Sequence, residues 1–142
     1  DGAAELQIVI NDGSFAINTD SVASGDIVIN VMNVGEHPHE VLIVRAPAGT
    51  EASDFAASTT GIPTGGTFVG QVTLPPGTQG SFVLTDVRAG TYTIVDLLPG
   101  DTGIPNVSDG MITELTVEYI QERLRAARLL AALVWFSLVP SG

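Results

Sequence analysis

Both histidines of the chain, His37 and His39, lie two positions apart in the segment NVGEHPHEVLIV, residues 33–44. Imidazole nitrogens are common ligands of transition metals, so paired histidines beside an Asn-x-Gly turn suggest a metal site. Zinc or Cu(II) would need further nitrogen or oxygen ligands from elsewhere in the chain. The other interpretation is structural: a His-Pro-His segment at a loop rim is often exposed, and aspartates in turns usually cap backbone amides.

Short apolar runs, many of them alternating with polar residues, predict the strands that would position these side chains. The chain contains 16 glycines and 8 prolines, many of them between the apolar runs, as expected for turns. About eight short strands before residue 119 predict an all-β sandwich or small barrel. One helical turn is expected near residues 52–57, inside a long polar loop. The predicted strands cover residues 5–12, 14–18, 25–35, 39–44, 67–74, 80–87, 90–97 and 110–118.

Three segments, taken in order, resemble the cupredoxin superfamily, whose members include plastocyanin and azurin. NVGEHPHEVLIV looks like the segment that carries the first copper ligand, and PPGTQGSFVLTDVRAGTYTIVDLLPGD (75–101) looks like the later ligand-bearing stretch. GMITELTVE (110–118) resembles the final strand, which begins at the axial methionine. The resemblance implies a cupredoxin-like Greek-key β-sandwich of about 7–8 strands as one domain, residues 1–118, followed by a C-terminal α-helix.

The type 1 copper site of that family uses two histidines, one cysteine and commonly a methionine. By resemblance, His39 matches the first histidine and Met111 the methionine, whereas Asp96 stands at the cysteine position and Asp101 at the second histidine. The chain contains no cysteine. Because blue copper requires a thiolate, we expect a domain that has lost its copper ligands, with no cofactor and with Met111 filling the core. Any other metal would have to use His37, His39, Asp96, Asp101 and Met111.

Composition argues against several other functions. The net charge is −11, and such an acidic chain repels phosphate backbones, so no nucleic acid is expected as a partner. Cysteine, lysine and a G-x-S-x-G segment are all absent, which removes thiol, Schiff-base and serine-elbow chemistry. We therefore predict no enzyme and no small-molecule substrate. The triplet NVS (106–108) matches a glycosylation acceptor.

After Glu118 the pattern changes to that of a helix, and residues 119–142 form a second unit. Polar residues up to Arg128 recur at helical spacing, but residues 129–139 are apolar all round apart from one serine. Eleven helical residues span about 16 Å, roughly half of a hydrocarbon layer of ~30 Å. The helix could fold back on the sandwich, dip into a bilayer or pack on another protein, and we expect membrane or membrane-protein contact. The residues expected at this surface are Arg123, Arg125, Arg128, Leu129, Leu130, Leu133, Val134, Trp135, Phe136 and Leu138.

Together these observations predict a non-catalytic, copper-free structural or binding subunit, attached by its C-terminal helix to a membrane surface or an integral membrane protein complex. The chain starts at Asp1 without a methionine, and we expect a processed, exported protein on the periplasmic or extracellular face, associated with the membrane. The family resemblance suggests an accessory subunit of a respiratory or photosynthetic electron-transfer complex. The alternative is a periplasmic copper or zinc carrier that uses His37 and His39.

Overall fold

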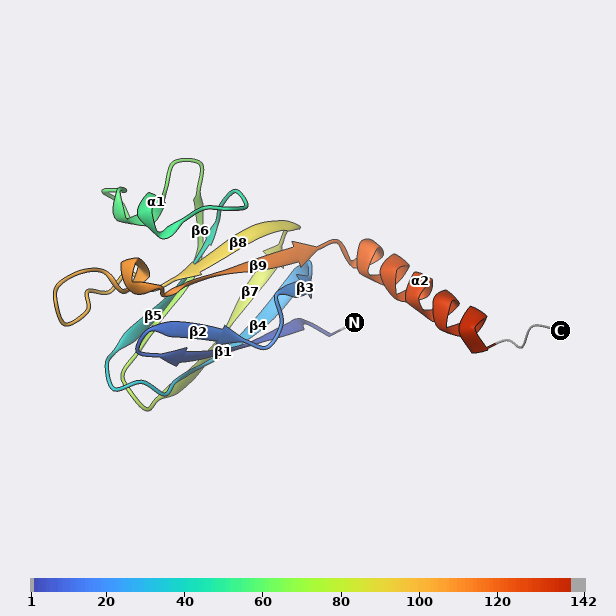
Figure 1. Ribbon diagram of the computed structural model, residues 1–142, viewed down its shortest axis with the longest axis horizontal. Coiled ribbons are helices and arrows are strands. Elements are labelled where there is room, and N and C mark those ends of the chain that lie inside the picture. The colour runs from blue at the N-terminus through green and yellow to red at the C-terminus, as the bar shows by residue number, and fades with distance from the viewer. Residues whose placement is uncertain (1, 139–142) are drawn as a thin grey trace.

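The structure is a computed structural model that describes residues 2–138, except for the side chains of residues 121–123, 126 and 135–138. The described chain forms a β-sandwich followed by one long helix (Figure 1). Its elements are β1 Ala4–Asn11, β2 Ser14–Ile17, β3 Ser21–Ala23, β4 Gly25–Asn33, β5 His39–Arg45, α1 Ala52–Ala56, β6 Thr67–Leu74, β7 Gln79–Val87, β8 Gly90–Val95, the 3₁₀ helix η1 Asn106–Asp109, β9 Ile112–Glu118 and α2 Ile120–Leu138.

The strands form two sheets. The four-stranded sheet has the order β2-β1-β4-β7, and the five-stranded sheet has the order β3-β9-β8-β5-β6. Most neighbouring strands are antiparallel, but β1 pairs in parallel with β4, and β3 pairs in parallel with β9. As the two strand orders show, consecutive strands often belong to different sheets. Residues far apart in the sequence consequently meet at the ends of the sandwich.

The main core lies between the two sheets and follows from the alternation in the sequence. Along β4, Ile27, Ile29 and Val31 point inward and are at most 2% exposed. Their neighbours Asn30 and Met32 lie on the outer face of the sheet, as a strand's period of two requires. The buried residues of this core are Leu6, Ile8, Ile10, Val22, Ile27, Ile29, Val31, Val41, Ile43, Leu74, Leu84, Val87, Tyr92, Ile94, Met111, Leu115 and Val117.

A second, smaller core covers the outer face of β5 and β8. Phe55 of α1 is 2% exposed and packs there with Val107 of η1 and with Val44 and Val95. β5 is therefore buried on both faces, which explains why HEVLIV is a nearly continuous apolar run instead of an alternating one.

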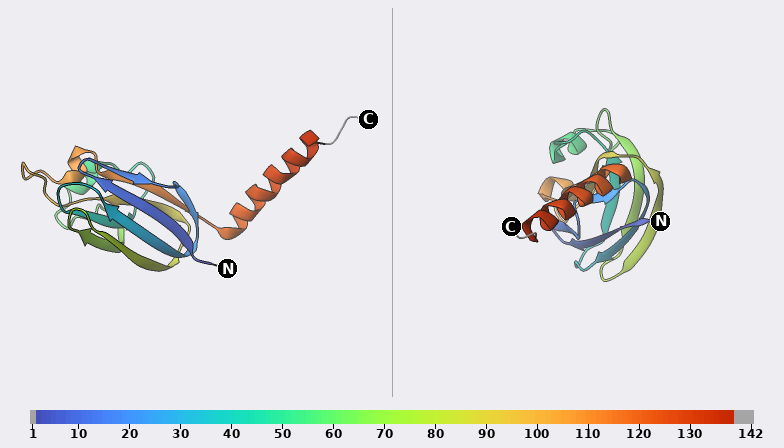
Figure 2. Two further views of the ribbon diagram at one scale, coloured as in Figure 1. Left: turned by 90° about the horizontal axis from the view of Figure 1, so that it is seen from below. Right: turned by 90° about the vertical axis from the view of Figure 1, so that its right-hand side faces the viewer.

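α2 extends away from the sandwich at the end opposite α1 and η1, as Figure 1 and the left view of Figure 2 show. Neither core includes any of the α2 side chains that the structure describes. No helix among the described residues combines the length and the apolar character needed to cross a membrane.

The predicted all-β sandwich with a C-terminal helix is confirmed, and so is the helical turn, which is α1. The strand count was too low, because the structure has nine strands and the sequence predicted 7–8. The missed strand, β3, is only three residues long, too short for an alternating pattern to stand out. The last strand was predicted to begin at residue 110, but β9 begins two residues later, because Gly110 and Met111 precede it.

Candidate functional site

The candidate site lies at the end of the sandwich opposite α2, where the loops of both sheets meet. His39 is the first residue of β5, and Asp96 directly follows β8. β5 and β8 are antiparallel neighbours, so the start of one strand lies beside the end of the other. Asp12 reaches the same point from the turn after β1, which belongs to the other sheet. The three residues therefore connect the two sheets at this end.

The central interaction is a histidine held between two carboxylates. His39 Nδ1 lies 2.6 Å from Asp96 Oδ2, and His39 Nε2 lies 2.8 Å from Asp12 Oδ1. His39 is 2% exposed and Asp96 is fully buried. An ionised carboxylate can only accept hydrogen bonds, so both ring nitrogens must donate, and the ring then carries a positive charge. We call Asp12, His39 and Asp96 the carboxylate–histidine cluster.

Asp96 is held in its ionised form by further donors. Its Oδ1 accepts a hydrogen bond from the backbone N–H of Leu98 at 2.9 Å, and its Oδ2 accepts one from Asn106 Nδ2 at 3.0 Å. A backbone amide and a side-chain amide nitrogen can only donate, so both bonds favour the carboxylate over the carboxylic acid. The buried charge is thus satisfied on both oxygens.

Asp12 is held by the turn that precedes β5. The backbone N–H groups of Glu36 and His37 donate to its carboxylate at 2.8 and 3.2 Å. The Glu36 amide first, and then the His39 ring, hold the pKa of Asp12 well below its usual range. The close approach of this turn to Asp12 requires a glycine at position 35, because a Cβ atom there would lie 2.2 Å from Asp12 Oδ1.

Asn33 fixes the shape of the same turn. Its side-chain nitrogen donates to the carbonyl groups of His37 and Leu74, and its Oδ1 accepts the N–H of Gly35 at 2.9 Å. Asn33 is fully buried, so these bonds satisfy polar groups that water does not reach.

Glu40 fixes the segment after Asp96. Glu40 is 6% exposed; its carboxylate accepts the N–H of Leu97 at 3.2 Å and a hydrogen bond from the side chain of Gln71. The backbone on both sides of the cluster is therefore held by buried side chains.

His37 and Asp101 lie outside the buried cluster. His37 Nδ1 is 3.3 Å from Asp12 Oδ2, and its Nε2 is 3.2 Å from Asp101 Oδ1. The two side chains are 49% and 80% exposed. They line an open hollow of about 640 Å³ beside the cluster, together with Asp12 and Asp109.

The five residues predicted as candidate metal ligands thus separate into three groups. His39 and Asp96 are bonded to each other, His37 and Asp101 form an exposed pair, and Met111 lies fully buried in the main core. Met111 touches the site only through its backbone, where its carbonyl group accepts the N–H of Asp96 at 3.3 Å.

This geometry does not fit type 1 copper. A metal ligand must offer a lone pair, and both nitrogens of His39 are already used on carboxylates. The cysteine position holds a buried aspartate, and the second histidine position holds an exposed one. Within the described residues, no three His, Cys, Asp or Glu side chains are arranged to hold a metal ion.

Sequence reasoning missed Asp12, Asn106 and Glu40. Asp12 stands in NDG, which was interpreted only as a turn, and its partner His39 is 27 residues away. The glycosylation pattern at 106–108 was misleading, because the Asn106 amide is bonded to Asp96 inside the protein. The expectation that aspartates in turns cap backbone amides is confirmed for Asp96, whereas the expected exposure holds for His37 and is wrong for His39.

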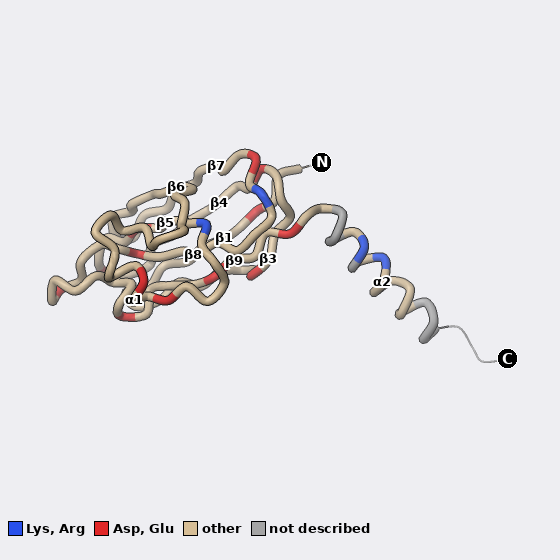
Figure 3. Tube along the Cα trace, turned by 90° about the horizontal axis from the view of Figure 1, so that it is seen from above, with Lys and Arg blue, Asp and Glu red and all other residues tan. Residues whose placement is uncertain are grey.

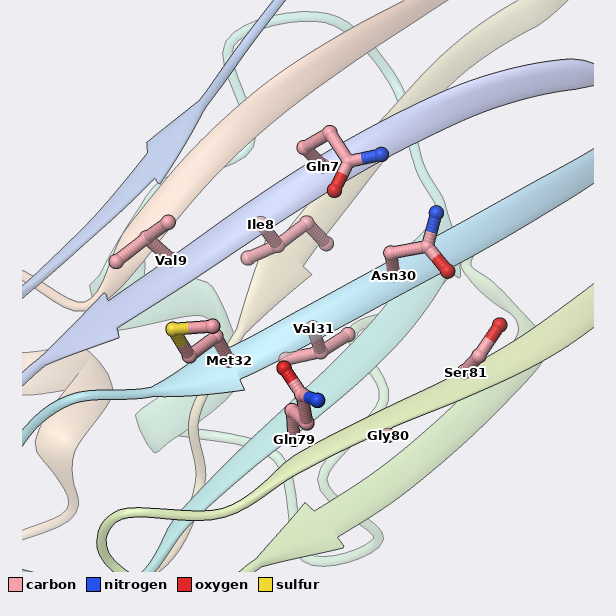
Figure 4. A pocket seen from close by; sticks show the side chains of 9 residues that line it. All are labelled: Gln7, Ile8, Val9, Asn30, Val31, Met32, Gln79, Gly80 and Ser81. Atoms are coloured by element: carbon pink, nitrogen blue, oxygen red, sulfur yellow. The ribbon is translucent and has the colours of Figure 1, made fainter.

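A second hollow, of about 510 Å³, lies on the outer face of the four-stranded sheet (Figure 4). Gln7, Asn30 and Ser81 form a polar row across β1, β4 and β7, next to Val9 and Met32. The residues lining it include no acid and no base, so Ser81 has no partner there that could activate its hydroxyl group.

The predicted contact surface of α2 is described in part. Arg125 and Arg128 are exposed, and the apolar side chains are each more than half exposed. The side chains of Arg123, Trp135, Phe136 and Leu138 lie outside the described residues, so their expected roles remain predictions. The exposed apolar residues of α2 are Ile120, Leu124, Leu129, Leu130, Leu133 and Val134.

Comparison with solved structures finds copper proteins. A reduced auracyanin from the photosynthetic bacterium Roseiflexus castenholzii aligns with a TM-score of 0.58 at 18% identity, over 82% of this chain and 99% of the auracyanin. Auracyanin A, a blue copper protein from Chloroflexus aurantiacus, aligns with a TM-score of 0.55 at 17% identity, over 82% of this chain and all of that chain. Reduced rusticyanin aligns with a TM-score of 0.53 at 15% identity, over 83% of this chain and 82% of that chain.

No protein-family model matches the chain, and no curated protein sequence matches it. The structural likenesses establish the fold, which is a cupredoxin-like β-sandwich, and the absence of cysteine fits the loss of the type 1 copper ligands.

Replacing Asp96 by alanine should strongly destabilise the fold. The change would leave a buried imidazole N–H, the Asn106 amide and the Leu98 N–H without their acceptor, and breaking a buried charged pair costs about 3–5 kcal/mol. Urea unfolding should show a lower midpoint with an unchanged slope. The matched control is Asp101→Ala, an exposed aspartate of the same hollow, which should change the free energy of unfolding by less than about 1 kcal/mol. Equal effects of the two substitutions would contradict this account.

Asp12 should make stability depend on pH in the acid range. Its folded pKa lies below the unfolded value of about 3.9, so its contribution is fully present above that value and is lost as pH falls through the folded pKa. Asp12→Asn should therefore be less stable than the wild type at neutral pH, and the difference should shrink below about pH 4. Urea unfolding from pH 7 down to strong acid measures this, with Asp20→Asn as an exposed control. A difference between wild type and Asp12→Asn that stays constant over the whole range would be the contrary result.

Proposed function

We propose that this cupredoxin-fold chain is a non-catalytic, copper-free binding subunit, held by α2 at a membrane surface or an integral membrane protein complex. Residues 1–118 would form an independently stable sandwich, and residues 119–142 would form the attachment segment. The proposed location is the periplasmic or extracellular face of the membrane. An accessory, non-redox role in a respiratory or photosynthetic electron-transfer complex is the setting we favour.

The observation that carries attachment is the exposure of α2. Leu124, Leu129 and Leu130 are 52%, 60% and 64% exposed, on a helix whose described side chains take no part in either core. Burying a large apolar side chain contributes about 1.5–3 kcal/mol, so these residues strongly favour apolar surroundings. An apolar stretch of about 16 Å suits one leaflet, or a groove between the helices of another protein, better than a full crossing.

The copper-free part of the proposal rests on the carboxylate–histidine cluster. A redox function would need an open metal position, whereas both ring nitrogens of His39 are bonded to carboxylates. The alternative function, a metal carrier using His37 and His39, would require His39 to give up at least one of its two hydrogen bonds, because each ring nitrogen is bonded to a carboxylate.

Removing the apolar character of α2 should abolish attachment and leave the sandwich folded. We expect Leu124→Gln/Leu129→Gln/Leu130→Gln to move from the membrane fraction to the soluble fraction of cells that express the full chain. The chain ending at residue 118 should also be soluble and should unfold cooperatively.

The matched control for this prediction replaces three apolar residues of the sandwich with similar exposure, Val34→Gln/Phe68→Gln/Val83→Gln, which are 50%, 52% and 55% exposed. It should stay in the membrane fraction. If the shortened chain unfolds or aggregates, α2 belongs to the core of the domain and the attachment proposal is wrong.

A further inference from the structure

The sandwich contains only two cationic residues besides its histidines, and the fold places them side by side. Arg45 ends β5 and Arg88 follows β7, 43 residues later in the sequence. Both line a hollow of about 660 Å³ together with Tyr119, the residue that precedes α2. In Figure 3 the basic positions of the sandwich lie away from its far end, and acidic positions are spread over both ends. We call these two residues the Arg45–Arg88 pair.

Tyr92 and Gly90 hold this pair in place. The Arg45 guanidinium lies over the Tyr92 ring, 5.9 Å from its centre, and the Tyr92 hydroxyl group donates to the Arg88 carbonyl oxygen at 2.6 Å. Arg45 Nη2 donates to the carbonyl oxygen of Ala89 at 2.9 Å. A Cβ atom at position 90 would lie 2.9 Å from the same Nη2, so glycine allows the arginine to lie across this turn. The Arg45 side chain and the backbone of Arg88 are therefore fixed by the fold, and Tyr92 contacts both residues.

The pair forms few hydrogen bonds and no salt bridge within the part of the chain that the structure describes. A guanidinium group has five N–H donors, and Arg45 uses one of them on Ala89. Asp86 lines the same hollow, but its backbone N–H is bonded to the Asp26 carboxylate, so these two acids are held near each other. Among the described residues, no carboxylate lies within salt-bridge distance of either arginine of the pair. In a chain of net charge −11, two adjacent unpaired cations suit an anionic ligand.

We propose that the Arg45–Arg88 pair binds the phosphate groups of an anionic lipid surface, the same surface that holds α2. This inference rests on the proposed attachment of α2, since it uses that helix to bring the pair to the headgroups. Tyr119 joins the pair's hollow to the root of the helix, and Arg125 and Arg128 continue the positive charge along it. Arginine is suited to phosphate because its planar fork can donate two parallel hydrogen bonds.

The test is co-sedimentation of the full chain with vesicles of neutral phosphatidylcholine, and with vesicles that also contain phosphatidylglycerol. The wild type should bind the anionic vesicles more tightly, by on the order of five-fold for each arginine that reaches the surface. Arg45→Gln/Arg88→Gln should lose the part of this preference that the pair supplies, on the order of 25-fold, while keeping its binding to neutral vesicles.

The control, Thr64→Glu/Thr102→Glu, makes the same change in net charge at two exposed positions outside the pair's hollow and should keep the preference. If the wild type binds both kinds of vesicle equally, the pair is not a headgroup site, although attachment by α2 stands. If the wild type binds inorganic phosphate alone as tightly as vesicles, the pair serves a soluble anion, which also overturns the inference. If the wild type and Leu124→Gln/Leu129→Gln/Leu130→Gln bind all vesicles equally weakly, lipid attachment by α2 has failed as well.

Discussion

A fully buried carboxylate needs hydrogen-bond donors or a cation beside it, and Asp96 is such a carboxylate at the loop end of the sandwich. An isolated ionised carboxylate in a protein interior is too costly to persist, so the surrounding structure has to supply a cation and hydrogen-bond donors. His39 supplies the cation, while Leu98 and Asn106 supply the donors. Asp12 then balances the second N–H of the histidine ring. Asp96 thus accounts for the buried histidine, and the histidine accounts for the position of Asp12.

This requirement also explains how the two sheets are joined at that end. Asp12 comes from the four-stranded sheet, and His39 and Asp96 come from the five-stranded sheet. In a cupredoxin a copper ion would bind residues at corresponding positions, whereas here the two hydrogen bonds of His39 make the connection. Gly35 and Asn33 shape the intervening turn so that its backbone amides reach Asp12. The opposite end of the molecule, with the Arg45–Arg88 pair and α2, is then the end that we assign to binding.

The sequence predicted the parts of this structure that depend on local pattern. The alternation of Ile27, Ile29 and Val31 predicted β4, and the apolar run after Arg128 predicted a helix with no polar face. The family motifs placed His39 near Asp96, and the structure confirms that contact. Asp12, Asn106 and Glu40 could not be predicted, because their partners lie in other strands and nothing near them in the sequence distinguishes a buried carboxylate or amide from an exposed one. The proximity of Arg45 and Arg88 depends in the same way on the pairing of β5 with β8.

The most direct test of the central claim is to offer the purified full chain the metals that its fold family suggests. The chain would be mixed with Cu(II) and, separately, with Zn(II), freed of excess metal, and examined by visible absorption and elemental analysis. The closed carboxylate–histidine cluster predicts no blue colour and no stoichiometric metal, because His39 has no lone pair to offer. Stoichiometric copper or zinc that is lost in His39→Ala would contradict the account and would support a metal carrier instead.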